Sequence, residues 1–280
     1  MAVAIVTDSA AALPPAIAEA RDIAVVPMWL TVGGEAVREG DVPAVDLLAQ
    51  PDVKTSGPPP GEFEAAVKER ARSTDDGVVV LTIASTMSST YESAVLGARA
   101  AGGAVRVIDT ATAAGAQALV VLAAADAAAR GASLDDVESA ARHAIAQVRL
   151  VATVPNLDHL VRSGRVPNIA GWAGRRLGLA PLFEFRDGHA HPLRPARGVA
   201  AARDRILGRW RRDRLEGARL HVAALHAQAE ADANWLLDRV REEIEPATAF
   251  VGSFGTVMVV HTGPGLVGLA WRWEPLEEAS

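Results

Sequence analysis

The chain has 280 residues, half of them hydrophobic, with a formal net charge of -6 and a sequence pI near 5.7. This length and hydrophobic content suffice for a substantial core in one large or two modest domains. The acidic balance removes the positive field that nucleic-acid binding needs, so neither DNA nor RNA is expected as a partner. Because the chain has no cysteine, disulfides, thiolate catalysis and cysteine-based metal sites are excluded, and a reducing, cytoplasmic location is expected.

Two apolar segments are long enough to be considered as a signal peptide or a membrane-spanning helix, and neither has the pattern that such a segment requires. The N-terminal MAVAIVTDSAA soon enters a polar turn and lacks a charged leader, which is typical of a strand rather than a signal peptide. The segment AAGAQALVVLAAADAAA is interrupted by Asp126 and falls short of the about eighteen apolar residues of a membrane-spanning helix. We therefore expect a buried helix there and no transmembrane segment.

In the first half of the chain, short β-branched runs alternate with alanine-rich helical patterns. Strands are predicted over residues 3–7, 23–32, 78–83 and 105–109. Helices are predicted over residues 90–101, 113–130 and 133–147, the last with Ser133 as its N-cap. This alternation predicts an α/β fold, in which an N-terminal lobe over residues 1–150 has a mostly parallel sheet flanked by helices.

After residue 150 the pattern changes and predicts a second lobe, residues 151–280. A strand at 150–154 is followed by APLFEFRDGHAHPL, a predicted hairpin with Asp187-Gly188 at its turn. Further strands are predicted in RLHVAALHA and ATAFVGSF, with helices near 199–213 and 229–243. The second lobe is therefore expected to be α+β with a mixed sheet.

Near the end of the chain, Gly263, Gly265 and Gly268 form a G-x-G-x-x-G pattern after an apolar run that predicts a strand. In dinucleotide-binding enzymes this pattern opens a long helix and is followed about twenty residues later by an acidic residue. Here Pro264 interrupts the pattern and too few residues follow it. We interpret the segment as a Gly/Pro turn between two strands, with His261 at the end of the first strand.

Three other motifs have a functional and a simpler interpretation. No G-x-S-x-G elbow accompanies the serines and histidines, which disfavours that type of serine hydrolase. His189 and His191 share one face of a predicted strand, but two ligands are too few for a metal site, so no metal is expected. Aspartates interrupt the basic stretch 203–214, which favours an exposed helix face over a docking surface for an acidic protein.

Segments rich in hydroxyl groups follow or adjoin the predicted strands: TDSA, KTSGPPPGEF, ASTMSSTY and DTATAAG. Loops at the carboxyl ends of parallel strands meet at one edge of a sheet, where open sheets bind ligands. Because these loops carry little charge besides Asp8, they predict a cleft for a carboxylate or a phosphate. Taken singly, each hydroxyl could equally serve as a helix cap, as Ser88 and Ser89 could before residue 90.

Six segments in order resemble the DegV family over essentially the whole chain: VTDSAAALP, KTSGPPPGEF, IASTMSSTYESA, VIDTATAAGAQALVV, LDHLVRSGRV and HTGPGLVG. The resemblance implies a two-domain protein that buries a long-chain fatty acid, such as palmitate, stearate or oleate, with the carboxyl group at the interdomain cleft. It also implies a separate ATP-dependent fatty acid kinase as partner, which makes the acyl-phosphate. The carrier itself is then expected to have no nucleotide site and no cofactor.

The same resemblance implies roles for particular residues. The hydroxyls expected to bind the carboxylate are those of Thr55, Ser56, Ser85 and Ser88. His261 matches a histidine that contacts the same group, while Arg165 and Arg197 match arginines expected to face the kinase or the transferred phosphoryl group. The chain departs from the family pattern at Ala84, Ser89, Ser163 and Ala180.

Elementary energetics are compatible with this interpretation. Burying about fifteen methylenes at ~0.8 kcal/mol each supplies roughly 12 kcal/mol at most, which the ordering of a flexible chain reduces. A buried carboxylate needs hydrogen-bond donors, and hydroxyls with an imidazole can provide them without a buried cation. Two alternatives stay open: an acyl hydrolase or transferase using Ser85 or Ser88 with His261, and a lipid sensor that serves no kinase.

Overall fold

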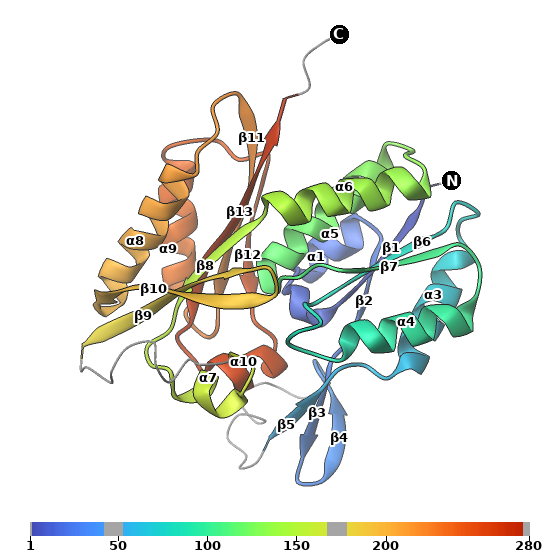
Figure 1. The fold of residues 1–280 in the computed structure, drawn as a ribbon, viewed down its shortest axis with the longest axis horizontal. Helices are drawn as coiled ribbons and strands as arrows, with labels where there is room; N and C mark the ends of the chain where they lie inside the picture. The colour runs from blue at the N-terminus through green and yellow to red at the C-terminus, as the bar shows by residue number, and fades with distance from the viewer. Residues whose placement is uncertain (1, 42–52, 167–177, 277–280) are drawn as a thin grey trace.

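The computed structural model describes residues 2–41, 53–166 and 178–276 (Figure 1). A parallel sheet in the first half has the strand order β2-β1-β6-β7. Its strands are β1 (Ala4–Asp8), β2 (Ile23–Val26), β6 (Val78–Thr82) and β7 (Val105–Asp109). The valine-rich run of the central strand β6 is buried on both faces, as in parallel sheets covered by helices.

Helices cover both faces of this sheet. The helices of the first half are α1 (Pro15–Ala20), α3 (Pro60–Ala71), α4 (Thr90–Ala101), α5 (Ala114–Ala129) and α6 (Leu134–Gln147), with a 3-10 turn at Ser9–Ala11. Helices α3 and α4 pack together on one face, and α5 and α6 on the other (Figure 1). The Ser133 hydroxyl accepts a hydrogen bond from the backbone N–H of Asp136, which confirms the predicted N-cap.

A small antiparallel sheet of order β4-β3-β5 projects from the first half (Figure 1). Its strands are β3 (Trp29–Val32), β4 (Glu35–Arg38) and β5 (Lys54–Ser56). The prediction of one strand over 23–32 is therefore wrong, because Pro27 lacks the N–H needed to continue a ladder and the chain passes from β2 into another sheet. The KTS segment, expected in a loop, lies in β5 and pairs with β3.

The second half contains a mixed sheet of order β10-β9-β8-β13-β11-β12. Its strands are β8 (Arg149–Thr153), β9 (Leu179–Arg186), β10 (His189–Arg197), β11 (Ala218–His226), β12 (Thr248–Ser253) and β13 (Val267–Pro275). Strands β11 and β12 are parallel, whereas the other neighbouring pairs are antiparallel. The predicted hairpin is confirmed, with Asp187 and Gly188 at φ values of 53° and 75°, as a two-residue turn of this kind requires.

Helices α8 (Gly198–Arg212) and α9 (Glu230–Arg241) pack on one face of the mixed sheet, and α5 contacts the other. Two short helices, α7 (Asp158–Ser163) and α10 (Thr256–Thr262), pack against each other at one end (Figure 1). On α8, Arg203, Arg209 and Arg211 form ion pairs within the fold. The expected charged helix face is thus partly neutralised by its neighbours.

Helix α5 lies between the two sheets and contacts β1 and β6 on one side and β11 and β13 on the other. Most of its residues are buried, as expected for the alanine-rich segment, and Asp126 pairs with Arg21 near its end. A Cβ added at Gly115 would lie 2.8 Å from the Cβ of Ala223. Small residues on α5 therefore allow the two sheets to approach the helix closely.

The expected α/β class is confirmed, with one parallel and one mixed sheet. The first sheet uses strands before residue 110 and the second uses strands from Arg149 onward, while the division into domains at 150 stays a prediction. No helix of the described residues is long and apolar enough to cross a membrane. Within the same residues, no group of three or more histidines and carboxylates could hold a metal ion.

The prediction of a strand before the C-terminal glycines is wrong. His261 lies in α10, a helix whose residues Val257, Met258 and Val259 are all buried. A short apolar run of β-branched residues does not distinguish a strand from a fully buried helix. Gly263 and Gly265 follow a helix and precede β13, and Gly268 lies within that strand, so the order is the reverse of the strand-turn-helix in a dinucleotide fingerprint.

Candidate functional site

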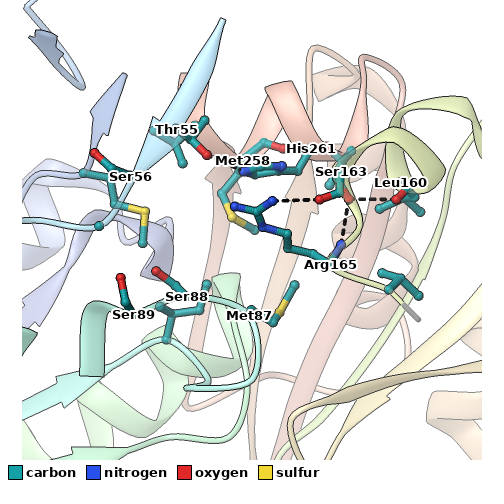
Figure 2. Close-up of a pocket in the computed structure, with 16 residues that line it drawn as sticks. Thr55, Ser56, Met87, Ser88, Ser89, Leu160, Ser163, Arg165, Met258 and His261 are labelled. Carbon is teal, nitrogen blue, oxygen red and sulfur yellow. Dashed lines mark hydrogen bonds between the residues drawn. The ribbon is translucent and has the colours of Figure 1, made fainter. Parts of the chain in front are cut away.

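A cavity of about 210 Å³, here called the head cavity, lies between the two halves of the fold (Figure 2). Its lining comes from β5, from the loop between β6 and α4, from α7 and the residues that follow it, and from α10. The lining residues are Met28, Thr55, Ser56, Gly57, Ile83, Met87, Ser88, Ser89, Leu160, Ser163, Arg165, Val166, Val257, Met258, His261 and Thr262. Side chains distant in sequence therefore meet at one place.

Thr55, from the first half of the fold, and His261, from the second half, meet in the head cavity. The Thr55 hydroxyl lies 2.7 Å from Nε2 of His261, although 206 positions separate the two residues. Thr55 is held by the pairing of β5 with β3, and His261 by the packing of α10 against α7. Figure 2 shows the two side chains next to each other, across the cavity from Ser88 and Ser89.

The environment of His261 keeps its imidazole neutral at physiological pH. Burial and the nearby charge of Arg165 lower the pKa of His261 from 6.5 to about 4. A neutral imidazole can donate one hydrogen bond and accept another. His261 is therefore a hydrogen-bonding group rather than a cation.

The amino-terminal end of α4 forms a second wall of the head cavity, where Ser88 and Ser89 line the space. The hydroxyls of Ser88 and Thr90 lie 2.7 Å apart, and that of Ser89 makes no capping hydrogen bond. Gly57 permits β5 to approach this end, because a Cβ there would lie 2.7 Å from the Thr90 hydroxyl. Ser56 is thereby brought close to the positive end of a helix dipole.

Arg165 lies at the exposed rim of the same cavity. Its Nη1 donates to the Ser163 carbonyl at 2.8 Å, and its backbone N–H donates to the Ser163 hydroxyl at 3.2 Å. Figure 2 shows the guanidinium on the same side of the cavity as His261. The rim thus carries a positive charge that remains accessible to solvent.

Two of the residues singled out from the sequence lie elsewhere. Ser85 is not part of the head-cavity lining, and its hydroxyl donates to Oδ2 of Asp109 at 2.5 Å. Arg197 is exposed at the end of β10, where the chain enters α8, and does not line the cavity either. The structure therefore gathers Thr55, Ser56, Ser88, Arg165 and His261 without the other two.

The head cavity adjoins an apolar cavity of about 50 Å³, here called the inner cavity. Residues lining both are Met87, Leu160, Val166, Met258 and Thr262. The inner cavity continues between α5 and the mixed sheet, past Ala113, Leu150, Phe183 and Phe185. A polar entrance therefore adjoins an apolar interior, with five lining residues in common.

Methionines were not singled out from the sequence, yet Met28, Met87 and Met258 line the head cavity and are three of the four in the chain. Methionine is flexible and polarisable and adapts to ligands of varied shape. Two features of the sequence could have pointed to them: methionine is rare in this chain, and Met87 lies within the hydroxyl-rich segment ASTMSSTY. Ser89 and Ser163, noted as departures from the family pattern, also line this cavity.

Comparison with known proteins gives the family. The family model for DegV, which carries the description "Uncharacterised protein, DegV family", matches residues 2–274. The chain belongs to the DegV family. A DegV domain-containing protein from Streptomyces coelicolor is 36% identical over 273 residues, which is 95% of this chain and 97% of that protein. A fatty acid-binding protein from Thermotoga maritima is 32% identical over 217 residues, 77% of this chain and 75% of that protein.

Solved structures of DegV proteins have the same fold. A DegV family protein from Thermus thermophilus, whose structure is described as one of fatty acid binding, superimposes with a TM-score of 0.90 at 27% identity. That comparison covers 98% of this chain and 100% of the other. DegV from Bacillus subtilis, described as a fatty acid binding protein, gives 0.86 at 26% identity, with 98% and 100% covered. The resemblance found in the sequence motifs is thus confirmed.

Proposed function

We propose that this chain binds a long-chain fatty acid, such as palmitate, stearate or oleate. The carboxylate lies in the head cavity and the acyl chain enters the inner cavity. The observation that carries the proposal is that a cavity lined by hydroxyls and an imidazole adjoins an apolar one and shares lining residues with it. The fatty acid-binding relatives from Thermotoga maritima and Thermus thermophilus support the same assignment.

The carboxylate is held by neutral donors. Nε2–H of His261 donates to the Thr55 hydroxyl, which in turn donates to one carboxylate oxygen. Ser56, Ser88 and Ser89 donate to the other oxygen, near the positive end of the α4 dipole. Supporting this set are the 2.7 Å contact between Thr55 and His261 and the low pKa of the imidazole. Ser85 acts indirectly, by bonding Asp109 and fixing the loop that carries Ser88.

We also propose that the chain presents its bound acid to a separate ATP-dependent fatty acid kinase and has no nucleotide site. Neutral donors leave the carboxylate able to attack a phosphoryl group. Arg165 at the rim, together with Arg197, contacts the kinase or the transferred phosphoryl. In this proposal, Arg165 lies near the reacting carboxylate, and Arg197, which does not line the head cavity, belongs to the docking surface.

Binding is tested first by mass spectrometry of lipid extracted from the natively purified protein. The delipidated protein is then titrated with palmitate and oleate, with methyl palmitate as a control that lacks the carboxylate. We expect a stoichiometric free fatty acid and much weaker binding of the ester. A preparation that contains no fatty acid and takes up neither added acid contradicts the proposal.

The kinase partnership is tested with Arg165→Ala and Arg197→Ala, using a purified fatty acid kinase, ATP and the loaded protein. We expect acyl-phosphate formation to fall at least about tenfold in each variant while palmitate binding is retained. Arg194→Ala, at an exposed arginine on the same strand as Arg197, is the matched control. Unchanged acyl-phosphate formation in both variants would contradict this part of the proposal and favour a lipid sensor.

The alternative of an acyl hydrolase receives little support from the geometry. A catalytic serine needs a base that accepts its proton near neutral pH, whereas His261 has a pKa of about 4 and bonds Thr55. Ser85 bonds Asp109 and Ser88 bonds Thr90 instead. Turnover of p-nitrophenyl palmitate that disappears in Ser88→Ala would nevertheless establish the hydrolase.

A further inference from the structure

A third cavity, here called the outer cavity, lies behind the inner cavity. Its volume is about 300 Å³, and its lining includes Thr112, Ile145, Arg149, Phe185 and the exposed Arg186. Among the described residues, Phe185 is the one that lines both the inner and the outer cavity. Its side chain is buried, with 6% of its surface exposed. The phenyl ring therefore forms part of the wall between an apolar space and a partly charged one.

The wall is a single layer of residues. On the loop before α5, Ala113 lines the inner cavity and the adjacent Thr112 lines the outer one. At the start of β8, Leu150 lines the inner cavity and the adjacent Arg149 the outer one. Phe185 pairs with Leu150 across β9 and β8, so the ring lies at this boundary.

The boundary is also held in place from outside. The backbone N–H of Gly188, in the turn after β9, donates to the Ala111 carbonyl at 2.7 Å. The Thr86 hydroxyl donates to the Gly188 carbonyl. The hairpin that carries Phe185 is thereby fastened to two loops of the first half, near the amino-terminal end of α5 (Figure 1). A fixed ring in this position limits how far an apolar chain can extend.

We infer that Phe185 closes the deep end of the acyl-binding space and sets the longest fatty acid the protein accepts. This inference rests on the proposed fatty acid binding. An acyl chain entering from the head cavity meets the phenyl ring at the end of the inner cavity. Removing the ring frees its own volume and opens the path to the outer cavity. Ile145 and Val148 there offer apolar surface to a longer chain.

The test measures dissociation constants for saturated acids of 14 to about 22 carbons in Phe185→Ala, with Phe185→Leu as a milder variant. Each pair of newly buried methylenes strengthens binding by about tenfold. The C20 acid has two such pairs more than the C16 acid, so we expect its preference over the C16 acid to rise by up to about 100-fold in Phe185→Ala. In Phe185→Leu the rise is smaller. Thermal unfolding of each variant verifies that it is folded.

Two further variants identify the cause of the shift. Phe183→Ala removes a ring that lines the inner cavity alone, so it adds space without opening the boundary, and its shift is expected to be smaller. Ile145→Trp fills the outer cavity and should leave the wild-type chain-length profile unchanged. Combined with Phe185→Ala, it should abolish the gain for the C20 acid.

The outcomes separate this inference from the proposed function. A wild-type protein that binds no fatty acid overturns the proposed function itself. A wild-type protein that binds palmitate, together with a folded Phe185→Ala whose chain-length preference is unchanged, overturns the inference alone. Retention of the shift in the double variant with Ile145→Trp also overturns it.

Discussion

Replacing Thr55 with valine tests the carboxylate site most directly, because valine has nearly the shape of threonine and lacks only the hydroxyl. That hydroxyl lies 2.7 Å from Nε2 of His261 and lines the head cavity. A hydrogen bond to a charged group contributes about 1.5–3 kcal/mol, so Thr55→Val should weaken palmitate binding by roughly 10- to 150-fold. The loss of the partner of His261 should also lower stability by about 1 kcal/mol.

The assay is displacement of a fluorescent fatty acid at pH 7.5 by palmitate and, in parallel, by hexadecanol. Hexadecanol has the same chain without a carboxylate, so its affinity should change less than about threefold. Thr31→Val, on the neighbouring strand β3 and outside the cavity lining, is the matched control. Wild-type affinity for palmitate in Thr55→Val, or an equal loss of palmitate and hexadecanol, would refute the proposed role of the hydroxyl.

Three further changes address pH and the support of the site. Because the folded state lowers the pKa of His261 from 6.5 to about 4, the wild type should lose up to about 2 kcal/mol relative to His261→Asn as pH falls from 7 to 5, measured by urea unfolding. Burial raises the pKa of Asp8 from 3.8 to about 6, so its effect has the opposite sign. The wild type should lose up to about 3 kcal/mol relative to Asp8→Asn as pH rises from 4 to 7, and a flat difference would contradict this. Glu39 accepts a hydrogen bond from the backbone N–H of Val257 at the start of α10, so Glu39→Ala should lower stability by about 1–3 kcal/mol and weaken palmitate binding. The exposed Glu35→Ala should do neither, and equal thermal shifts in the two variants would speak against a role for Glu39.

The sheets of this fold were readable from the sequence because their signals are local. The valine- and isoleucine-rich runs that became β1, β6 and β7 are short, bounded by turns and separated by helical patterns. The Asp187-Gly188 pair predicted its hairpin turn, since both residues adopt positive φ. Elements whose conformation is set mainly by nearby residues in the sequence can thus be predicted from the sequence alone.

Helix α10 shows where such reasoning fails. Most of its residues are β-branched or apolar and favour a strand. However, the carboxylate of Glu39, 218 positions away, accepts a hydrogen bond from the N–H of Val257. At the other end Gly263, with φ of 74°, turns the chain out of the helix. Burial on all sides then removes the alternation that would have identified the helix, so the tertiary environment decides its conformation.

The residues of the candidate site were likewise predictable from the sequence only in part. The family motifs identified the residues that meet in the head cavity, yet the same motif also contained Ser85, whose hydroxyl is taken by Asp109 from the next strand. Serines a few positions apart in one loop cannot be distinguished without knowing which neighbour each one meets. Met28, Met258 and Phe185 lie outside these motifs, and only the structure shows that they line the cavities.

On the proposed function, the chemistry of the head cavity follows from a lining that is neutral apart from Arg165 at its rim. A guanidinium paired directly with the carboxylate would reduce the nucleophilicity of its oxygens, whereas hydroxyls and a neutral imidazole stabilise the charge more weakly. Arg165 lies at the rim, close enough to lower the pKa of His261 and exposed enough to meet a phosphoryl group. Burial and, to a lesser degree, this charge lower the pKa of His261 and keep the imidazole neutral before the acid binds. If the proposed function is correct, separating the neutral hydrogen-bonding groups from the positive charge at the rim lets one site hold a fatty acid and leave its carboxylate reactive.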